Sequence, residues 1–239
     1  EHEGEPGCWT FPEHDAQERI IGLGLRFRDG RKGQLTGGRR GLTLPIGWRA
    51  LPDPVVVVEG PSDVLAGRAQ GLNVIGRPSN SGGADLLVQA LRGRRVIILG
   101  EHDRKPDGRW PGKEGAEAVA AKLTAAWGWP VPVTFPPNSA KDLRAWATAA
   151  AAAAGAAPDF APLGARFLEA ISPPAILLHA ERAARRGGRL VVRVFRWADV
   201  PEGGAFHTDR LDLESAKAHA KFASAVAKLD SSVDPAALA

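Results

Sequence analysis

Short apolar runs alternate with longer mixed segments through the middle of the chain. Four consecutive valines at positions 55–58 form the clearest run, and others follow at 73–76, 95–99 and 131–135. Short runs rich in β-branched residues are typical of strands that are buried on both faces of a parallel sheet. The intervening segments have the length and composition of helices. Four strands separated by three helices therefore predict a parallel sheet flanked by helices.

The segments before this sheet follow a different pattern. Residues 1–18 are acidic and polar and are interpreted as an entry segment, whereas residues 19–28 predict a strand. An Asp-Gly pair at 29–30 favours a hairpin turn into a second strand from Gln34. The N-terminal part is therefore expected to be a small β-rich subdomain.

The segments after the sheet are mainly helical. Residues 147–158 are nearly all alanine and can extend a helix that starts near Lys141, until Gly155 and Pro158 end it. Further helices are predicted at 160–171 and 213–229, with a strand at 190–195. The chain thus divides into four parts: a basic β-rich N-terminal subdomain (1–53), the parallel α/β domain (54–146), an alanine-rich linker or helix extension (147–158) and a smaller α+β segment of unknown role (159–239).

Charge and composition narrow the possible partners. Between Arg19 and Arg49 there are eight basic residues and a single acid, a local excess that suits a nucleic-acid phosphate backbone. A solvated basic face is the alternative. The chain has one cysteine and no methionine, which favours a cytoplasmic excerpt of a longer polypeptide. No apolar stretch approaches the roughly 18 residues that span a bilayer, so no membrane partner is expected.

Acidic residues follow two of the predicted strands directly. Glu59 ends the valine run, and Glu101 and Asp103 come just after the strand at 95–99. Ligands of open parallel sheets bind beyond the carboxyl ends of the strands, so these three carboxylates are expected to converge there. Their mutual repulsion would be relieved by Mg²⁺ or Mn²⁺, which prefer oxygen ligands. Asp63 has the competing interpretation of a cap or first-turn residue of the next helix.

These residues carry a resemblance to a known family. The runs VVVVEGPSDVLAGRAQGLNVIGRPSNSGG and RRVIILGEHDRKPDGRWPG, followed by the Lys-Asp of FPPNSAKDL, resemble the Toprim domain in their order and spacing. The resemblance implies catalysis by Glu59, Glu101 and Asp103 on bound metal, with Asp142 as a further metal ligand. Asp63 and Lys141 would support them. Position 101 is Glu where the family usually has Asp. Three consequences stay open: activity is retained, its metal preference is altered, or it is lost.

The basic N-terminal segment resembles the subdomain that precedes Toprim in bacterial and phage primases. This likeness implies primer synthesis, a nucleotidyl transfer from nucleoside triphosphates on single-stranded DNA. The chain would be the core of a larger primase or primase-helicase, with a helicase domain possible in the same longer polypeptide. Arg28, Lys32, Arg39 and Arg40 would contact the template or the triphosphate. Arg77 begins a loop that can cradle a phosphate or can be a plain connection.

Two other functions stay open at this stage. A Toprim nuclease would use the same acids on a water nucleophile, and an inactive nucleic-acid-binding module would have lost the metal site at position 101. A self-contained topoisomerase is excluded because the chain has no tyrosine to hold a broken strand covalently.

Overall fold

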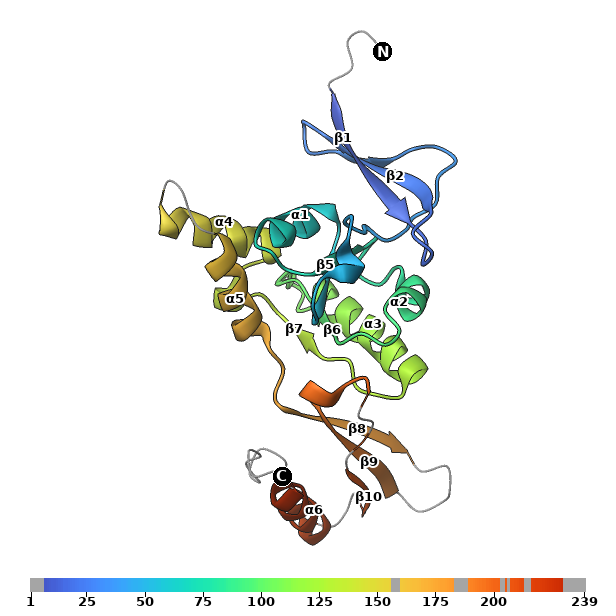
Figure 1. Cartoon of the computed structure of the whole chain (residues 1–239), viewed down its shortest axis with the longest axis vertical. Helices are drawn as coiled ribbons and strands as arrows, with labels where there is room; N and C mark the ends of the chain where they lie inside the picture. The colour runs from blue at the N-terminus through green and yellow to red at the C-terminus, as the bar shows by residue number, and fades with distance from the viewer. Residues whose placement is uncertain are drawn as a thin grey trace. The chain divides into compact units, whose positions relative to one another are not determined.

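The computed structural model describes residues 7–155, 160–182, 189–202, 205, 207–212 and 216–229. The chain forms two compact units, residues 1–127 with 133–172, and residues 128–132 with 173–239. Each unit is described by itself (Figure 1). No helix in the described ranges is long and apolar enough to cross a membrane.

The first unit is built on a four-stranded parallel sheet, which confirms the predicted fold class. Its strands are β4 (Val55–Glu59), β5 (Val74–Arg77), β6 (Val96–Leu99) and β7 (Val133–Thr134), in the order β5-β4-β6-β7. The four valines of β4 are almost completely buried because helices cover both faces of the sheet. This double burial is why β4 is apolar at consecutive positions instead of alternating.

Five helices accompany the sheet: α1 (Pro61–Ala69), α2 (Ala84–Ala90), α3 (Pro111–Trp127), α4 (Leu143–Ala154) and α5 (Phe160–Ile171). Helix α1 packs against α4, and α2 packs against α3 on the other side of the sheet (Figure 1). A Cβ atom at Gly67 would lie 2.5 Å from Val74 Cγ2 and 2.9 Å from Leu143 Cδ2. The missing side chain therefore lets α1 approach β5 and α4 closely. Helix α4 extends into the alanine run as predicted, and Gly155 caps its C-terminus; Pro158 lies outside the described residues.

The N-terminal subdomain is a three-stranded antiparallel sheet of β1 (Cys8–His14), β2 (Ile20–Phe27) and β3 (Lys32–Gln34), in the order β1-β2-β3. Sequence reasoning assigned no strand within residues 1–18, whereas the structure has β1 there, and β1 pairs with the whole length of β2. Glu13 is buried there because Arg40 neutralises it, with 2.9 Å between Arg40 Nε and Glu13 Oε1.

The second unit contains another antiparallel sheet, β8 (Ile176–Arg182), β9 (Arg189–Arg196) and β10 (His207–Asp212), in the order β10-β9-β8. Helix α6 (Ala216–Leu229) packs on β10. The sequence predicted β9 and α6 but missed β8 and β10; residues 213–215 of the predicted last helix lie outside the described residues. Three 3₁₀ turns complete the chain: η1 (Trp48–Ala50), η2 (Pro137–Ser139) and η3 (Trp197–Asp199).

Candidate metal centre

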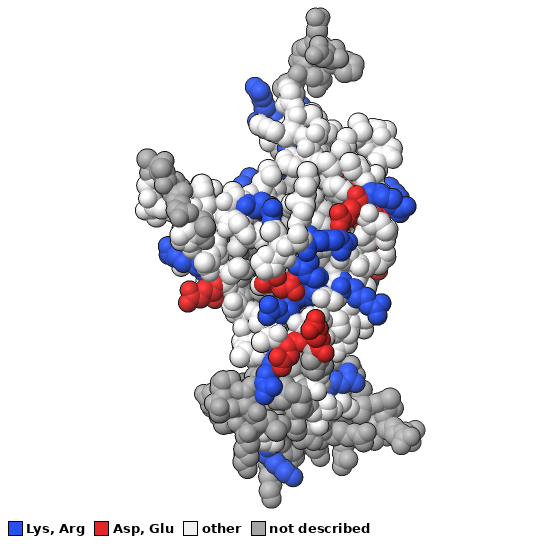
Figure 2. Space-filling view, in the orientation of Figure 1, with Lys and Arg blue, Asp and Glu red and all other residues white. Residues whose placement is uncertain are grey.

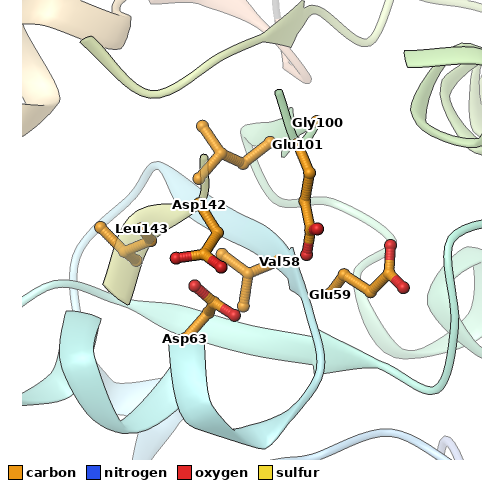
Figure 3. A pocket seen from close by; sticks show the side chains of 8 residues that line it. Val58, Glu59, Asp63, Gly100, Glu101, Asp142 and Leu143 are labelled. Atoms are coloured by element: carbon orange, nitrogen blue, oxygen red, sulfur yellow. The ribbon is translucent and has the colours of Figure 1, made fainter. Parts of the chain in front are cut away.

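Three carboxylates meet beyond the carboxyl ends of β4 and β6. One oxygen each of Asp63, Glu101 and Asp142 can be chosen so that all three lie within 4.8 Å of one another. Asp63 belongs to the first turn of α1, Glu101 follows β6, and Asp142 precedes α4. Figure 3 shows the two aspartates facing each other and Glu101 reaching toward them. Glu59 lines the same pocket but extends away from the aspartates.

The N-terminus of α4 fixes both aspartates. Asp142 is its N-cap, and its Oδ1 accepts a hydrogen bond of 2.7 Å from the Ala145 N–H. Asp63 Oδ1 accepts one of 2.9 Å from the Arg144 N–H. The first N–H groups of a helix lack intrahelical partners and carry the positive end of its dipole, so they stabilise carboxylates. Because each bond uses one oxygen, the second oxygen of each aspartate stays available to a ligand.

The backbone around Glu101 is held by aromatic residues. Trp110 Nε1 donates to the Glu101 carbonyl oxygen at 2.6 Å. The rings of Trp110, His102 and Phe135 pack together, with centroids 4.9 to 5.6 Å apart. The His102 N–H donates to the Lys141 carbonyl oxygen at 2.8 Å, which ties the Glu101 loop to the segment that carries Asp142.

Burial and neighbouring charges raise the pKa values of two of the acids. Burial raises the pKa of Glu101 to about 7, and the negative charges of Glu59 and Asp63 add to this. Burial raises the pKa of Asp63 to about 6, against the lowering effect of the Arg144 N–H. Lys141 Nζ lies 3.9 Å from an oxygen of both Glu101 and Asp142, but this side chain is 61% exposed. A single solvated cation leaves the repulsion largely uncompensated.

The three-acid group fits a divalent cation. Two oxygens bound to one ion at about 2.1–2.4 Å lie at most about 4 to 5 Å apart, which the observed spacing satisfies. The donors are all carboxylate oxygens, the type that hard cations prefer, whereas structural zinc sites usually contain sulfur or nitrogen ligands. A bound cation would also relieve the repulsion that raises the two pKa values.

The predicted site residues fall into two groups. The pocket lining includes Glu59, Glu101 and Asp142, and it also includes Asp63, which the sequence had placed in a supporting role. Asp63 does not cap its own helix but bonds to α4. Asp103 is outside the three-acid group: its Oδ1 accepts a hydrogen bond of 2.7 Å from the Gly112 N–H at the start of α3. Its role in metal binding stays a prediction.

Basic residues lie beside the acids, and sequence reasoning missed two of them. Burial lowers the pKa of Arg26, the positive charges of Arg144 and Arg40 lower it further, and the negative charge of Asp63 raises it. A Cβ atom at Gly60, the N-cap of α1, would lie 4.0 Å from an Arg26 guanidinium nitrogen, so Arg26 lies beside the start of the helix that carries Asp63. Arg144 donates its N–H to Asp63. On the face drawn in Figure 2, Lys and Arg side chains lie next to Asp and Glu side chains. Arg144 could have been noticed because it follows Asp142 closely.

The other predicted basic residues differ in exposure. Four of them are exposed: Arg28 lies in the turn after β2, Lys32 begins β3, and Arg39 and Arg40 lie in the loop after β3. Arg40 also donates a hydrogen bond to the Pro78 carbonyl oxygen, which joins the N-terminal subdomain to the loop after β5. Arg77, at the start of that loop, is completely buried.

Comparison with known proteins gives a likeness of fold. No family model and no curated protein matches the chain. A DnaG primase catalytic domain solved with single-stranded DNA is 23% identical over 62% of this chain and 51% of that one, with a TM-score of 0.47. The chain is similar to primase catalytic domains. The Escherichia coli primase catalytic core is 22% identical over 59% and 48% of the two chains, with a TM-score of 0.47.

A bacteriophage structure is also similar. The primase fragment of the bacteriophage T7 primase-helicase protein is 19% identical over 59% of this chain and 57% of that one, with a TM-score of 0.40. The chain thus spans about half the length of the solved primase structures that it matches.

Proposed function

We propose that the chain is the catalytic core of a primase-type nucleotidyltransferase that uses Mg²⁺ or Mn²⁺ to join nucleotides on single-stranded DNA. The observation that carries this proposal is the meeting of Asp63, Glu101 and Asp142 beyond the carboxyl ends of parallel strands, beside a group of arginines. Acids in this arrangement suit a metal ion, and arginines beside them suit phosphates. The motif order that resembles Toprim supports the same assignment.

In this reaction a 3′-hydroxyl oxygen attacks the α-phosphorus of a nucleoside triphosphate, a phosphodiester bond forms and pyrophosphate leaves. A divalent ion on Asp63, Glu101 and Asp142 supplies charge neutralisation at the phosphates. Glu59 lines the same pocket without joining the three acids, so we assign it the role of general base for the hydroxyl proton. Lys141 presents an exposed ammonium beside two of the acids, where it can meet an incoming phosphate.

The arginines and lysines around the pocket would hold the template and the triphosphate. Arg144 follows Asp142 and its N–H bonds to Asp63. The exposed side chains of Arg28, Lys32, Arg39 and Arg40 supply further positive charge on the N-terminal subdomain. Asp103 would position the Glu101 loop through its hydrogen bond to the start of α3. A helicase domain in the same longer polypeptide and a cytoplasmic location remain predictions of the resemblance.

The decisive experiment uses the full chain with single-stranded DNA, labelled nucleoside triphosphates and Mg²⁺ or Mn²⁺. We expect new oligonucleotides from the wild type and none from Glu101→Gln or Asp142→Asn. Asp107→Asn is the matched control, because Asp107 is an exposed acid of the same loop that pairs with Arg109. Shortened DNA in place of new oligonucleotides would indicate a nuclease. DNA binding without any product, unchanged in the variants, would indicate an inactive module.

A further inference from the structure

Arg77 is a buried cation without a hydrogen-bond partner. It is the last residue of β5, its exposed fraction is 0%, and none of its three guanidinium nitrogens has a partner among the described residues. Burying a charge without hydrogen bonds is costly, so an arginine in this position needs compensating negative charge nearby.

The sheet register places Glu59 beside Arg77. The two residues are directly paired on the neighbouring parallel strands β4 and β5. A Cβ atom at the preceding residue, Gly76, would meet Val64 of α1 at 2.9 Å. Because side chains alternate along a strand, Arg77 points to the sheet face away from α1. Paired residues of adjacent strands share a face of the sheet, so Glu59 points to the same face as Arg77. In agreement, Figure 3 shows the Glu59 side chain extending away from Asp63 and Asp142.

The charges near Arg77 differ from those near the metal centre. Burial lowers the pKa of Arg77, and the carboxylates of Glu59 and Glu101 oppose this by favouring its charged form. Asp63 and Asp142 lie on the other side of Glu101, against α1 and α4 (Figure 3). The charges are therefore divided: the Arg77 guanidinium is buried behind the pocket on the Glu59 side, whereas no buried cation of the described residues accompanies the three acids on the other side.

We propose that Arg77 is a built-in cation that takes the place of a second divalent ion beside Glu59 and Glu101, so that the pocket holds a single metal ion. This inference rests on the proposed metal centre. Four carboxylates line the pocket. One divalent ion on Asp63, Glu101 and Asp142, combined with Arg77, would leave a single net negative charge, beside which the exposed Lys141 lies. A second divalent ion would leave an excess of positive charge before any substrate arrives.

The burial of Arg77 favours this internal role over the phosphate contact predicted from sequence. Its guanidinium has no exposed surface and does not line the pocket, so a phosphate could reach it only after the loop after β5 had moved. Glu59 in contrast lines the pocket, and it is paired in register with Arg77 on the neighbouring strand.

The test is a titration of the full chain with Mn²⁺, without nucleotide, in which electron paramagnetic resonance measures the free ion. We expect one Mn²⁺ per chain for the wild type and for Arg77→Lys, which keeps the charge. Arg77→Met removes the charge but keeps a long side chain, and we expect it to bind two. Arg109→Met, an exposed arginine with an acidic partner, is the matched control and should bind one.

The possible outcomes separate the two proposals. No bound Mn²⁺ in the wild type would overturn the metal centre itself, whereas two ions in the wild type, or one in a folded Arg77→Met variant, would overturn only the role of Arg77. If circular dichroism shows that Arg77→Met does not fold, Glu59→Gln decides. We then expect one ion with a dissociation constant changed less than about tenfold, and a larger loss would show that Glu59 is a ligand.

Discussion

Raising the pH should destabilise the metal-free protein through its own acid cluster. The pKa values of Asp63 and Glu101 are raised to about 6 and about 7 in the folded chain, from ordinary values of 3.8 and 4.5. The folded state therefore keeps these protons to a higher pH than the unfolded state does. Between about pH 4 and pH 7 the unfolded state binds fewer protons, so the free energy of unfolding falls as the pH rises.

The size of the effect follows from the two shifts. One pKa unit corresponds to about 1.4 kcal/mol, and each group shifts by roughly 2 units. The repulsion between the two acids contributes to both pKa values, so adding the two shifts counts it twice. We expect a loss on the order of 3 kcal/mol between about pH 4.5 and pH 7.5, which is a large part of the stability of a typical domain.

Urea unfolding in the presence of a chelator measures this loss, with fluorescence of the buried Trp48 and Trp146 as the signal. Asp63→Asn should flatten the pH dependence, because an amide oxygen can still accept the Arg144 N–H but does not titrate. Asp107→Asn, on the exposed part of the loop, should leave it unchanged. A wild-type stability that is constant or rises over this range would refute the reasoning, as would an unaltered slope in Asp63→Asn. Saturating Mn²⁺ at the higher pH should restore about 2 to 3 kcal/mol at a concentration near 100 times its dissociation constant.

Three further predictions concern the residues around the cluster. Asp142→Asn should weaken Mn²⁺ binding at least about tenfold in the titration above, whereas Asp103→Asn should weaken it less; equal losses would make Asp103 a ligand. Trp110→Phe keeps the ring packing but removes the donor to the Glu101 carbonyl, so urea unfolding should show a loss of about 1 kcal/mol, and no loss would argue against that bond. Arg40→Gln should weaken binding to single-stranded DNA and lower the slope of affinity against salt by about one phosphate contact, and an unchanged slope would remove Arg40 from the DNA surface.

The sheet and one edge of the site could be predicted from sequence because both depend on local pattern. The valines at 55–58 indicate a doubly buried strand, and an acid directly after such a strand has to lie at the carboxyl edge of the sheet. This reasoning placed Glu59 and Glu101 in the same pocket, where the structure has them. This prediction required only that β4 and β6 be neighbours in the sheet, and short connections between elements restrict the strand order strongly.

The grouping of Asp63 with Asp142 depends on contacts that no local pattern contains. Asp63 bonds to a residue 81 positions further along the chain, and the two aspartates meet because α4 packs against α1. Glu101 and Asp103 stand at alternate positions, yet only Glu101 joins the cluster. The reason is that Trp110 and the start of α3 determine the shape of the loop. At Gly112, in the first turn of α3, an added Cβ atom would lie only 2.7 Å from both Asp103 Oδ1 and the Glu101 carbonyl oxygen.

The failure to predict β1 has a similar cause. Strand β1 contains a proline and three polar residues, and one of these, Glu13, is buried beside Arg40, which lies 27 positions away. A pattern search treats such a charged residue as exposed, since an acid is seldom buried without a partner. Arg40 also donates a hydrogen bond to the loop after β5. The missed strand therefore contains the partner of an arginine that connects the N-terminal subdomain to the parallel sheet.

Contacts within the chain position the residues of the acid cluster. Helix α4 supplies two backbone N–H donors to Asp63 and Asp142, and the aromatic packing around Trp110 fixes the backbone of Glu101. These contacts offset part of the cost of keeping the carboxylates ionised, while burial and the neighbouring acids still raise the pKa values of Asp63 and Glu101. The chain therefore holds three carboxylates close together, where their negative charges repel one another. A divalent ion that bound between them would relieve this repulsion. On the Glu59 side the fixed charge of Arg77 has this effect in place of an ion. An exchangeable ion is therefore needed only at Asp63, Glu101 and Asp142.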